Sequence, residues 1–112
     1  MELTKGAVVL VELVGQGDLI RGVRPAVVVS NSVGNKASRI AIVSPLTSKS
    51  KKPLPTHTEI TPTKWNGLTK KSTLIAEQIT AINKSSIIKV LGNLNSSEMM
   101  KVNTAIQRSL EI

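Results

Sequence analysis

The fold of this chain is constrained most by short runs of apolar, β-branched residues, which glycine, proline and polar residues interrupt. The clearest run is Ala26–Val29, and such a run is typical of a strand buried on both faces. Pro25 can begin this strand, because its first residue need not donate a backbone hydrogen bond. Pro25 also holds Arg24 in an extended conformation. We therefore predict a strand over Ala26–Ser30, with the Arg24 guanidinium held at its start.

Similar runs occur along most of the chain and predict a fold built mainly from strands. We expect further strands at Val8–Val14, Arg39–Ser44, Thr56–Thr61, Ser72–Ala76 and Gln78–Ile82. The Gly15–Gly22 segment is a glycine-framed loop whose tip can approach a ligand. Asn31–Asn35 is expected to be a turn or loop, and Lys84–Lys89 to contain one helical turn.

The clearest helix lies at the end of the chain. Asn95 is in the capping position and Glu98 follows three residues later, as in a capping box. Apolar residues then recur at helical spacing, and this stripe should pack on the sheet: Met99, Val102, Ile106 and Leu110. Since the 112 residues contain no repeat and no linker, we expect a single domain over residues 1–112. Its fold class is mainly β with a C-terminal helix, arranged as a small, partly open β-barrel.

The charge of the chain favours a polyanionic partner. Fifteen Lys and Arg residues against seven Asp and Glu give a formal net charge of +8, and basic side chains displace the counterions condensed on phosphates. The acidic residues are scattered as one aspartate, Asp18, and six glutamates, so no cluster is expected to hold Mg²⁺ for two-metal cleavage. We therefore expect no metal and no cofactor, and metal-free chemistry if nucleic acid is cleaved.

Composition also indicates the compartment. The chain has no cysteine, which excludes disulfides and thiolate metal sites and suits a reducing cytosol. The apolar run within Met1–Val14 is short and broken by Glu12, unlike a signal peptide. No segment approaches the ~18 apolar residues of a membrane span. We expect a soluble cytoplasmic protein that does not contact a membrane.

Five segments form an ordered set of motifs along the chain: Gly22–Asn31, Ser44–Lys49, Leu54–Ile60, Glu77–Ile79 and Asn95–Val102. Together they resemble the MazF/PemK/Kid family of toxin endoribonucleases, most closely its Gram-positive branch. The resemblance implies an SH3-like barrel that forms a homodimer, with single-stranded RNA crossing a groove over the dimer interface. It also implies a cognate antitoxin that places an acidic segment in the same groove.

The same resemblance implies an activity and a set of site residues. Family members cut mRNA at short sequences without metal, leave 2′,3′-cyclic phosphate or 3′-phosphate and 5′-hydroxyl ends, and arrest growth. Their catalytic arginine and threonine correspond to Arg24 and Thr47. Their RNA-binding positions correspond to Gln16, Arg21, Ser48, Lys49, Leu54, Pro55, His57, Glu77 and Gln78.

The chemistry of these residues accounts for part of such a reaction. Arg24 offers a planar fork of donors that matches phosphate oxygens, but it is permanently protonated and cannot be a base. The Thr47 hydroxyl can hydrogen-bond the scissile phosphate or orient the nucleophile, but it is a poor base. The general base is not visible in the sequence, and Glu77, His57 and the RNA itself remain candidates.

Several alternatives stay open at this point. Arg24 could form a structural salt bridge with Glu12 or Glu77, and the basic run Lys49–Lys52 could be a solvated face. The single Trp65 could stack on a base, but packing in the interior is expected instead.

Two other functions compete with RNA cleavage. Related toxins with this barrel bind DNA gyrase through the region of the C-terminal helix, although this helix carries no tryptophan. The chain could also be a nucleic-acid-binding module without activity, because Ala7 and Thr80 stand where the family usually has aspartate and a basic residue.

Overall fold

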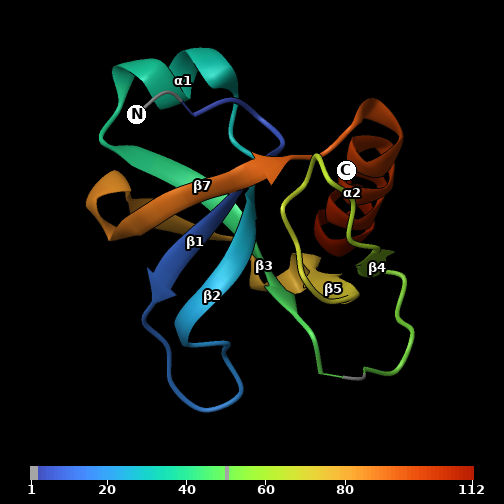
Figure 1. Ribbon diagram of the computed structural model, residues 1–112. Coiled ribbons are helices and arrows are strands. Elements are labelled where there is room, and N and C mark those ends of the chain that lie inside the picture. Colours follow the sequence, from blue (N-terminus) through green and yellow to red (C-terminus); the bar gives the residue numbers. More distant parts are fainter. Residues whose placement is uncertain (1–2, 50) are drawn as a thin grey trace.

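The computed structural model describes residues 3–49 and 51–112, and within them seven antiparallel strands form a sheet that does not close (Figure 1). The strands are β1 (Ala7–Leu13), β2 (Gly22–Val28), β3 (Ile40–Thr47), β4 (His57–Ile60), β5 (Ser72–Ile75), β6 (Thr80–Asn83) and β7 (Ile87–Asn93). The helices are α1 (Ser32–Ala37) and α2 (Ser96–Leu110), with single 3-10 turns η1 (Ala76–Gln78) and η2 (Lys84–Ser86). The predicted mainly β fold with a C-terminal helix is confirmed.

The strand β3 joins the two parts of the sheet, whose order is β4-β5-β3-β2-β1-β7. Its first part pairs with β2 and β6, and its last two residues, Leu46 and Thr47, pair with β5. Pro45 lies between the last residue paired by β6 and the first paired by β5, so its missing amide hydrogen interrupts neither ladder. At this transition β3 parts from β2.

Two hydrophobic clusters lie on opposite faces of β1 and β2, because alternate residues of a strand point to opposite sides. Val9 and Val28 belong to the first cluster. Val8 and Val27 belong to the second, which Val102 of α2 helps to complete. All five side chains are fully buried. Burial of the Ala26–Val29 run on both faces is therefore confirmed for its strand residues.

The capping box of α2 is confirmed. The Asn95 side chain accepts the Glu98 N–H at 2.8 Å, and the Glu98 carboxylate accepts the Asn95 N–H at 2.9 Å. Val102 and Ala105 are buried against the sheet. The prediction that Leu110 packs there is wrong, since Leu110 is 50% exposed. Leu110 points in nearly the same direction as Met99 and Ile106, but it lies in the last turn of α2 and, unlike them, does not pack against the second cluster.

Several predicted boundaries are wrong. The strand β2 begins at Gly22, so Arg24 lies inside it, opposite Val11, rather than at its start. The strand predicted over Arg39–Ser44 continues to Thr47, because β5 offers β3 a new partner there.

Three further elements differ from the predictions. The turn expected at 31–35 is the start of α1, which the Asn31 side chain caps by accepting the Gly34 N–H at 2.6 Å. The strand expected over 78–82 begins only at Thr80, because η1 precedes it. The helical turn at 84–89 is limited to η2, and β7 follows unpredicted because Lys89 and Gly92 interrupt its apolar run.

Trp65 does not pack in the interior, contrary to the prediction. Its side chain is 67% exposed, and the Lys64 ammonium lies 4.7 Å from the ring centroid. The buried position in this turn is taken by Asn66, whose amide is hydrogen-bonded to Thr61 and Thr63. A polar side chain is tolerated in the interior when its groups are hydrogen-bonded in this way.

Candidate nucleic-acid interface

Arg24 of β2 and Thr47 of β3 face one another where the two strands part. The strands pair as far as Ala26 and Pro45, and continuing that register by two residues places Arg24 opposite Thr47. Both residues line a surface hollow of about 240 Å³. Arg24 is half-buried, and Thr47 is only 5% exposed. The loss of pairing thus opens a space that these two side chains border.

Neighbouring backbone groups orient both side chains. The Arg24 Nε–H donates to the Arg21 carbonyl oxygen at 3.1 Å, which uses one of its five guanidinium N–H groups. Thr47 Oγ1 accepts the Lys49 backbone N–H at 3.2 Å, so the hydroxyl proton can be donated to a ligand. The two side chains are therefore held in place and still have donors to offer.

The charge of this hollow is strongly positive. Its lining includes four basic residues and one acidic residue: Arg21, Arg24, Lys49, Lys51 and Asp18. Within the described part of the chain Arg24 forms no ion pair, so the alternative of a salt bridge with Glu12 or Glu77 is wrong. Cations around a hydroxyl group are suited to a phosphate.

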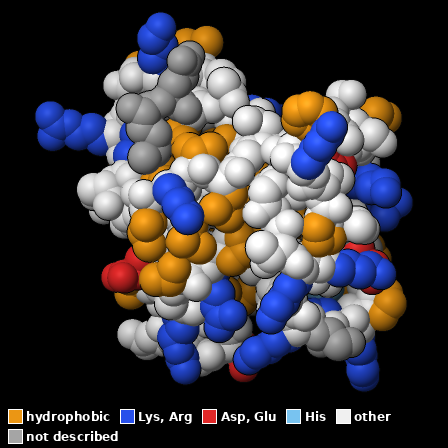
Figure 2. Space-filling model, in the orientation of Figure 1, with side chains coloured by type: hydrophobic (Ala, Val, Ile, Leu, Met, Phe, Trp, Pro, Cys, Tyr) orange, Lys and Arg blue, Asp and Glu red, His pale blue; other side chains and the backbone are white. Residues whose placement is uncertain are grey.

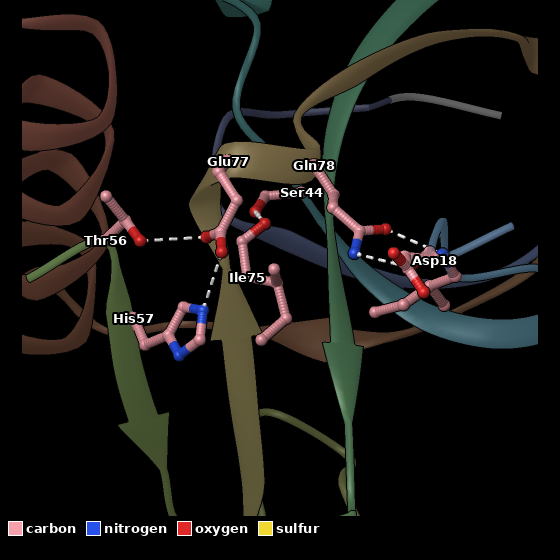
Figure 3. A network of polar contacts seen from close by, with 8 residues as sticks. Asp18, Ser44, Thr56, His57, Ile75, Glu77 and Gln78 are labelled. Carbon is pink, nitrogen blue, oxygen red and sulfur yellow. Dashed lines mark hydrogen bonds and ion pairs between the residues drawn. The ribbon is translucent and has the colours of Figure 1, made fainter. Parts of the chain in front are cut away.

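A second polar cluster joins β4 to η1 (Figure 3). Glu77 accepts the Thr56 hydroxyl at 2.9 Å, and its carboxylate lies 3.0 Å from His57 Nε2. Burial raises the pKa of Glu77, but a backbone hydrogen bond, the two side-chain hydrogen bonds and the His57 charge together lower it. The His57 side chain is 9% exposed, and its Nδ1 has no hydrogen-bond partner among the described residues. Glu77 is therefore an ionised partner that orients His57.

Gln78 follows Glu77 on η1 and points to the opposite side, toward the β1–β2 loop (Figure 3). Its Oε1 accepts the Ile20 N–H at 2.7 Å, and its Nε2 donates to the Asp18 carbonyl oxygen at 3.3 Å. These bonds fasten the loop that forms one wall of the Arg24–Thr47 hollow.

Shared residues connect a row of hollows, which we call the basic groove. Lys51 lines the Arg24–Thr47 hollow and also a shallow one of about 90 Å³ that includes Leu54 and His57. His57 in turn lines a third hollow of about 290 Å³ between β4 and α2. Figure 2 shows Lys and Arg side chains gathered at the lower edge of the molecule, where the β1–β2 loop and the segment after β3 lie in Figure 1.

The predicted site residues are largely brought together by the fold. Those that line the basic groove are Arg21, Arg24, Thr47, Lys49, Leu54, Pro55 and His57. Glu77 and Gln78 line a separate hollow of about 210 Å³ and support the groove through their hydrogen bonds. Ser48 lines a further hollow on the other side of Arg24, and Gln16 is exposed in the β1–β2 loop.

The sequence predictions miss two basic residues of the groove, Lys101 and Arg108 on α2. They lie seven residues apart, which is two helical turns, so they share one face of the helix. This spacing could have predicted from the sequence that both side chains lie on the same face of the helix. Lys51 and Lys52, which one alternative placed on a solvated face, line the groove as well, and Lys51 lines two of its hollows.

The described residues contain neither a membrane-spanning helix nor a cluster of metal ligands. None of the helices there is long and apolar enough to cross a membrane. In residues 3–49 and 51–112, no three His, Asp or Glu side chains come together as a group that could hold a metal ion.

Comparisons with known proteins agree on one family. Residues 4–110 match the family model described as PemK-like, MazF-like toxin of type II toxin-antitoxin system. The chain is 38% identical over 96 residues to the endoribonuclease MazF of Staphylococcus saprophyticus, covering 85% of this chain and 79% of that protein. It is also 38% identical over 92 residues to the endoribonuclease EndoA of Bacillus subtilis, covering 81% and 78%.

Solved structures share the fold. A mycobacterial endoribonuclease in complex with its cognate antitoxin superposes with a TM-score of 0.81 at 24% identity, covering 98% of this chain and 96% of that one. MazF from Deinococcus radiodurans gives 0.78 at 20% identity, covering 97% and 96%. With the family match over nearly its whole length, the chain belongs to the PemK-like, MazF-like toxins of type II toxin–antitoxin systems.

Proposed function

We propose that this chain is an endoribonuclease toxin whose residues 1–112 act as one domain and cleave single-stranded RNA, including mRNA, in the basic groove. Family membership supports the class of activity, and two relatives at 38% identity carry the name endoribonuclease. The observation that carries the mechanism is the Arg24–Thr47 pair in a cationic hollow.

The proposed reaction is attack of an RNA 2′-hydroxyl oxygen on the adjacent phosphorus, without a metal ion. The new P–O2′ bond forms while the bond to the 5′-oxygen breaks; the 2′-hydroxyl loses its proton and the 5′-oxygen gains one. The products are a 2′,3′-cyclic phosphate, which water can open to a 3′-phosphate, and a 5′-hydroxyl. Arg24 stabilises the added charge on the five-coordinate phosphate. The Thr47 hydroxyl donates to the same phosphate or orients the 2′-hydroxyl.

Glu77 is not the proton acceptor in this mechanism. Its carboxylate is tied to Thr56 and His57, its pKa is lowered, and it does not line the hollow that contains Arg24. The Glu77 carboxylate is a weaker proton acceptor than an ordinary glutamate and lies in a different hollow. It is suited instead to orienting His57 toward the nucleobases of the bound RNA. His57 does not line the hollow that contains Arg24 either, which leaves an oxygen of the RNA itself as the acceptor.

The charge of the basic groove also supports a protein partner, the acidic segment of a cognate antitoxin. Similar solved structures include an endoribonuclease with its cognate antitoxin and a MazE–MazF complex of Deinococcus radiodurans. The proposal further includes a homodimer that acts in the cytoplasm.

Incubating a long single-stranded RNA with the protein in excess EDTA, and then mapping the ends, tests this function. We expect cuts at a short recurring sequence with 5′-hydroxyl ends. Arg24→Ala should lower kcat/KM by about 10²–10³-fold, the usual loss when a donor that stabilises transition-state charge is removed. The control is Lys36→Ala, which should cut like the wild type because Lys36 is exposed on α1 and lines none of these hollows.

Two results would contradict the proposal. One is cleavage that depends on added Mg²⁺. The other is growth arrest that survives Arg24→Ala but is lost when exposed residues of α2 are changed, which would favour the gyrase-binding alternative.

A further inference from the structure

Arg24 also lines a second hollow, of about 240 Å³, which adjoins the basic groove at Arg24 and which we call the flanking hollow. Its lining residues come from β2, the end of β3 and the segment that leads into β5: Arg24, Pro25, Leu46, Ser48, Thr69 and Lys70. Thr47 lines the first hollow, whereas the next residue, Ser48, lines the flanking hollow. Among the described residues, Arg24 alone lines both hollows.

The side chains of the flanking hollow match the chemistry of a nucleotide. Its charged lining residues, Arg24 and Lys70, are both cationic, and no carboxylate is among its described lining residues. The Ser48 and Thr69 hydroxyls add neutral donors for a phosphate or a ribose, and Pro25 adds an apolar surface. Such a combination is suited to a polyanion that also carries flat or apolar parts.

The turn that precedes Lys70 is anchored by hydrogen bonds of the Asn66 side chain. Asn66 is fully buried, and its Oδ1 accepts the Leu68 N–H at 3.0 Å. The Asn66 Nδ2 donates to the Thr61 carbonyl oxygen at 3.0 Å and to the Glu98 carboxylate at 3.2 Å. This connects the segment to the first turn of α2. The wall of the flanking hollow is therefore preorganised, which lowers the entropic cost of binding.

Lys70 and its neighbour Lys71 differ in how their charges are balanced. The Lys71 ammonium pairs with Glu59 at 2.9 Å. Lys70 forms no ion pair within the described ranges, and it lines the flanking hollow, which Lys71 does not. Lys70 is thus the lysine of this pair whose charge is available to a ligand.

We infer that the flanking hollow holds the nucleotide next to the scissile phosphate, with Lys70 neutralising the phosphate of that nucleotide. The inference rests on the proposed function, because it extends the path of the RNA from the basic groove past Arg24. Arg24 then contacts two consecutive phosphates, one in each hollow.

The probe for this subsite is an RNA of the mapped cleavage sequence with a 2′-deoxy nucleotide at the cut position, which binds but lacks the attacking hydroxyl. Its Kd is measured over a range of salt for the wild type, Lys70→Ala and Lys71→Ala. Lys70→Ala should reduce the slope of log K against log salt by about 0.7, as for one lost phosphate contact on a single strand. Lys71→Ala should leave the slope unchanged. With cleavable RNA, Lys70→Ala should raise KM more than it lowers kcat.

Shortened RNAs locate the subsite. Removing the nucleotides on one side of the cut should abolish the difference between the wild type and Lys70→Ala, whereas shortening on the other side should preserve it. Both lysines are exposed, so both variants should fold, and circular dichroism checks this.

Equal salt slopes for Lys70→Ala and Lys71→Ala would overturn the inference. So would a difference between the wild type and Lys70→Ala that persists in both shortened RNAs. A third contrary result is that Lys70→Ala weakens binding of the antitoxin segment but not of RNA. These differ from failure of the proposed function, in which the wild-type protein would not cut the unmodified RNA at all.

Discussion

Two polar clusters of this protein differ in how their charges are balanced. Around Arg24 and Thr47, the lining residues carry four positive charges and one negative charge, and Arg24 has no carboxylate partner within the described residues. Around His57, the carboxylate of Glu77 already provides a partner. An external anion is needed to balance the first cluster but not the second. We therefore assign the reacting phosphate to the first cluster and the positioning of RNA to the second.

The difference originates in the backbone. Arg24 and Thr47 lie where β2 and β3 separate, and the hollow that they border opens beyond the last paired residues of the two strands. His57 instead lies on β4, which stays paired with β5, and η1 follows β5 directly. That connection brings Glu77 beside His57.

Replacing Thr47 should have the largest effect on activity among the changes that test this comparison. Thr47→Val removes the hydroxyl and keeps a similar shape, so kcat should fall by about 10²-fold, as for one lost donor to the transition state. Thr47→Ser retains the hydroxyl and should keep most of the activity. The Lys49 N–H loses its acceptor in the valine variant, at a cost of about 1 kcal/mol, which urea unfolding can measure. Equal kcat values for the two variants would contradict a role for the hydroxyl.

Replacing Glu77 tests whether the second cluster takes part in proton transfer. Glu77→Gln keeps the hydrogen-bonding shape and removes the charge, so we expect a loss of kcat of less than about tenfold and a higher KM. Loss of a general base costs about 10²–10⁴-fold instead. A decrease of that size in single-turnover cleavage would reverse the roles of the two clusters.

The pH dependence of stability gives an independent measure of the same residue. The pKa of Glu77 is lowered from the ordinary value of 4.5. Its contribution to stability is therefore complete above that value and is lost as the pH falls through the lower pKa of the folded state. The Tm of the wild type should decrease more than that of Glu77→Gln on acidification. The difference should be small, because the Glu77 side chain is 42% exposed.

The smallest expected effect concerns the connection between the two clusters. Gln78→Ala removes both hydrogen bonds to the β1–β2 loop, each worth about 0.5–1.5 kcal/mol. The Ile20 amide should then exchange its hydrogen faster, and KM should rise a few-fold while global stability changes little. Gln107→Ala, on an exposed face of α2, is the control. Unchanged exchange at Ile20 would show that the loop does not depend on Gln78.

Much of the fold follows from local pattern, and the exceptions have identifiable causes. The strands around Ala26–Val28 and the Asn95–Glu98 cap depend on residues close together in sequence, and both were predicted. The strand β7 was missed because Lys89 and Gly92 interrupt it, although pairing with β1 determines its structure. Trp65 was expected inside, but the pairing of Asn66 decides which side chain of that turn is buried.

The sequence by itself determined the fold class, the excess of positive charge and the residue types available for phosphate chemistry, because periodicity and charge are local properties. The tertiary structure decided which of those residues meet. The β2–β3 register places Arg24 opposite Thr47, and the space between them opens because β3 changes partners. Glu77 meets His57 because η1 follows β5. Tertiary structure also brings Lys51, Lys101 and Arg108 into one groove. Contacts between distant segments depend on strand pairing and helix packing, which no single stretch of sequence encodes.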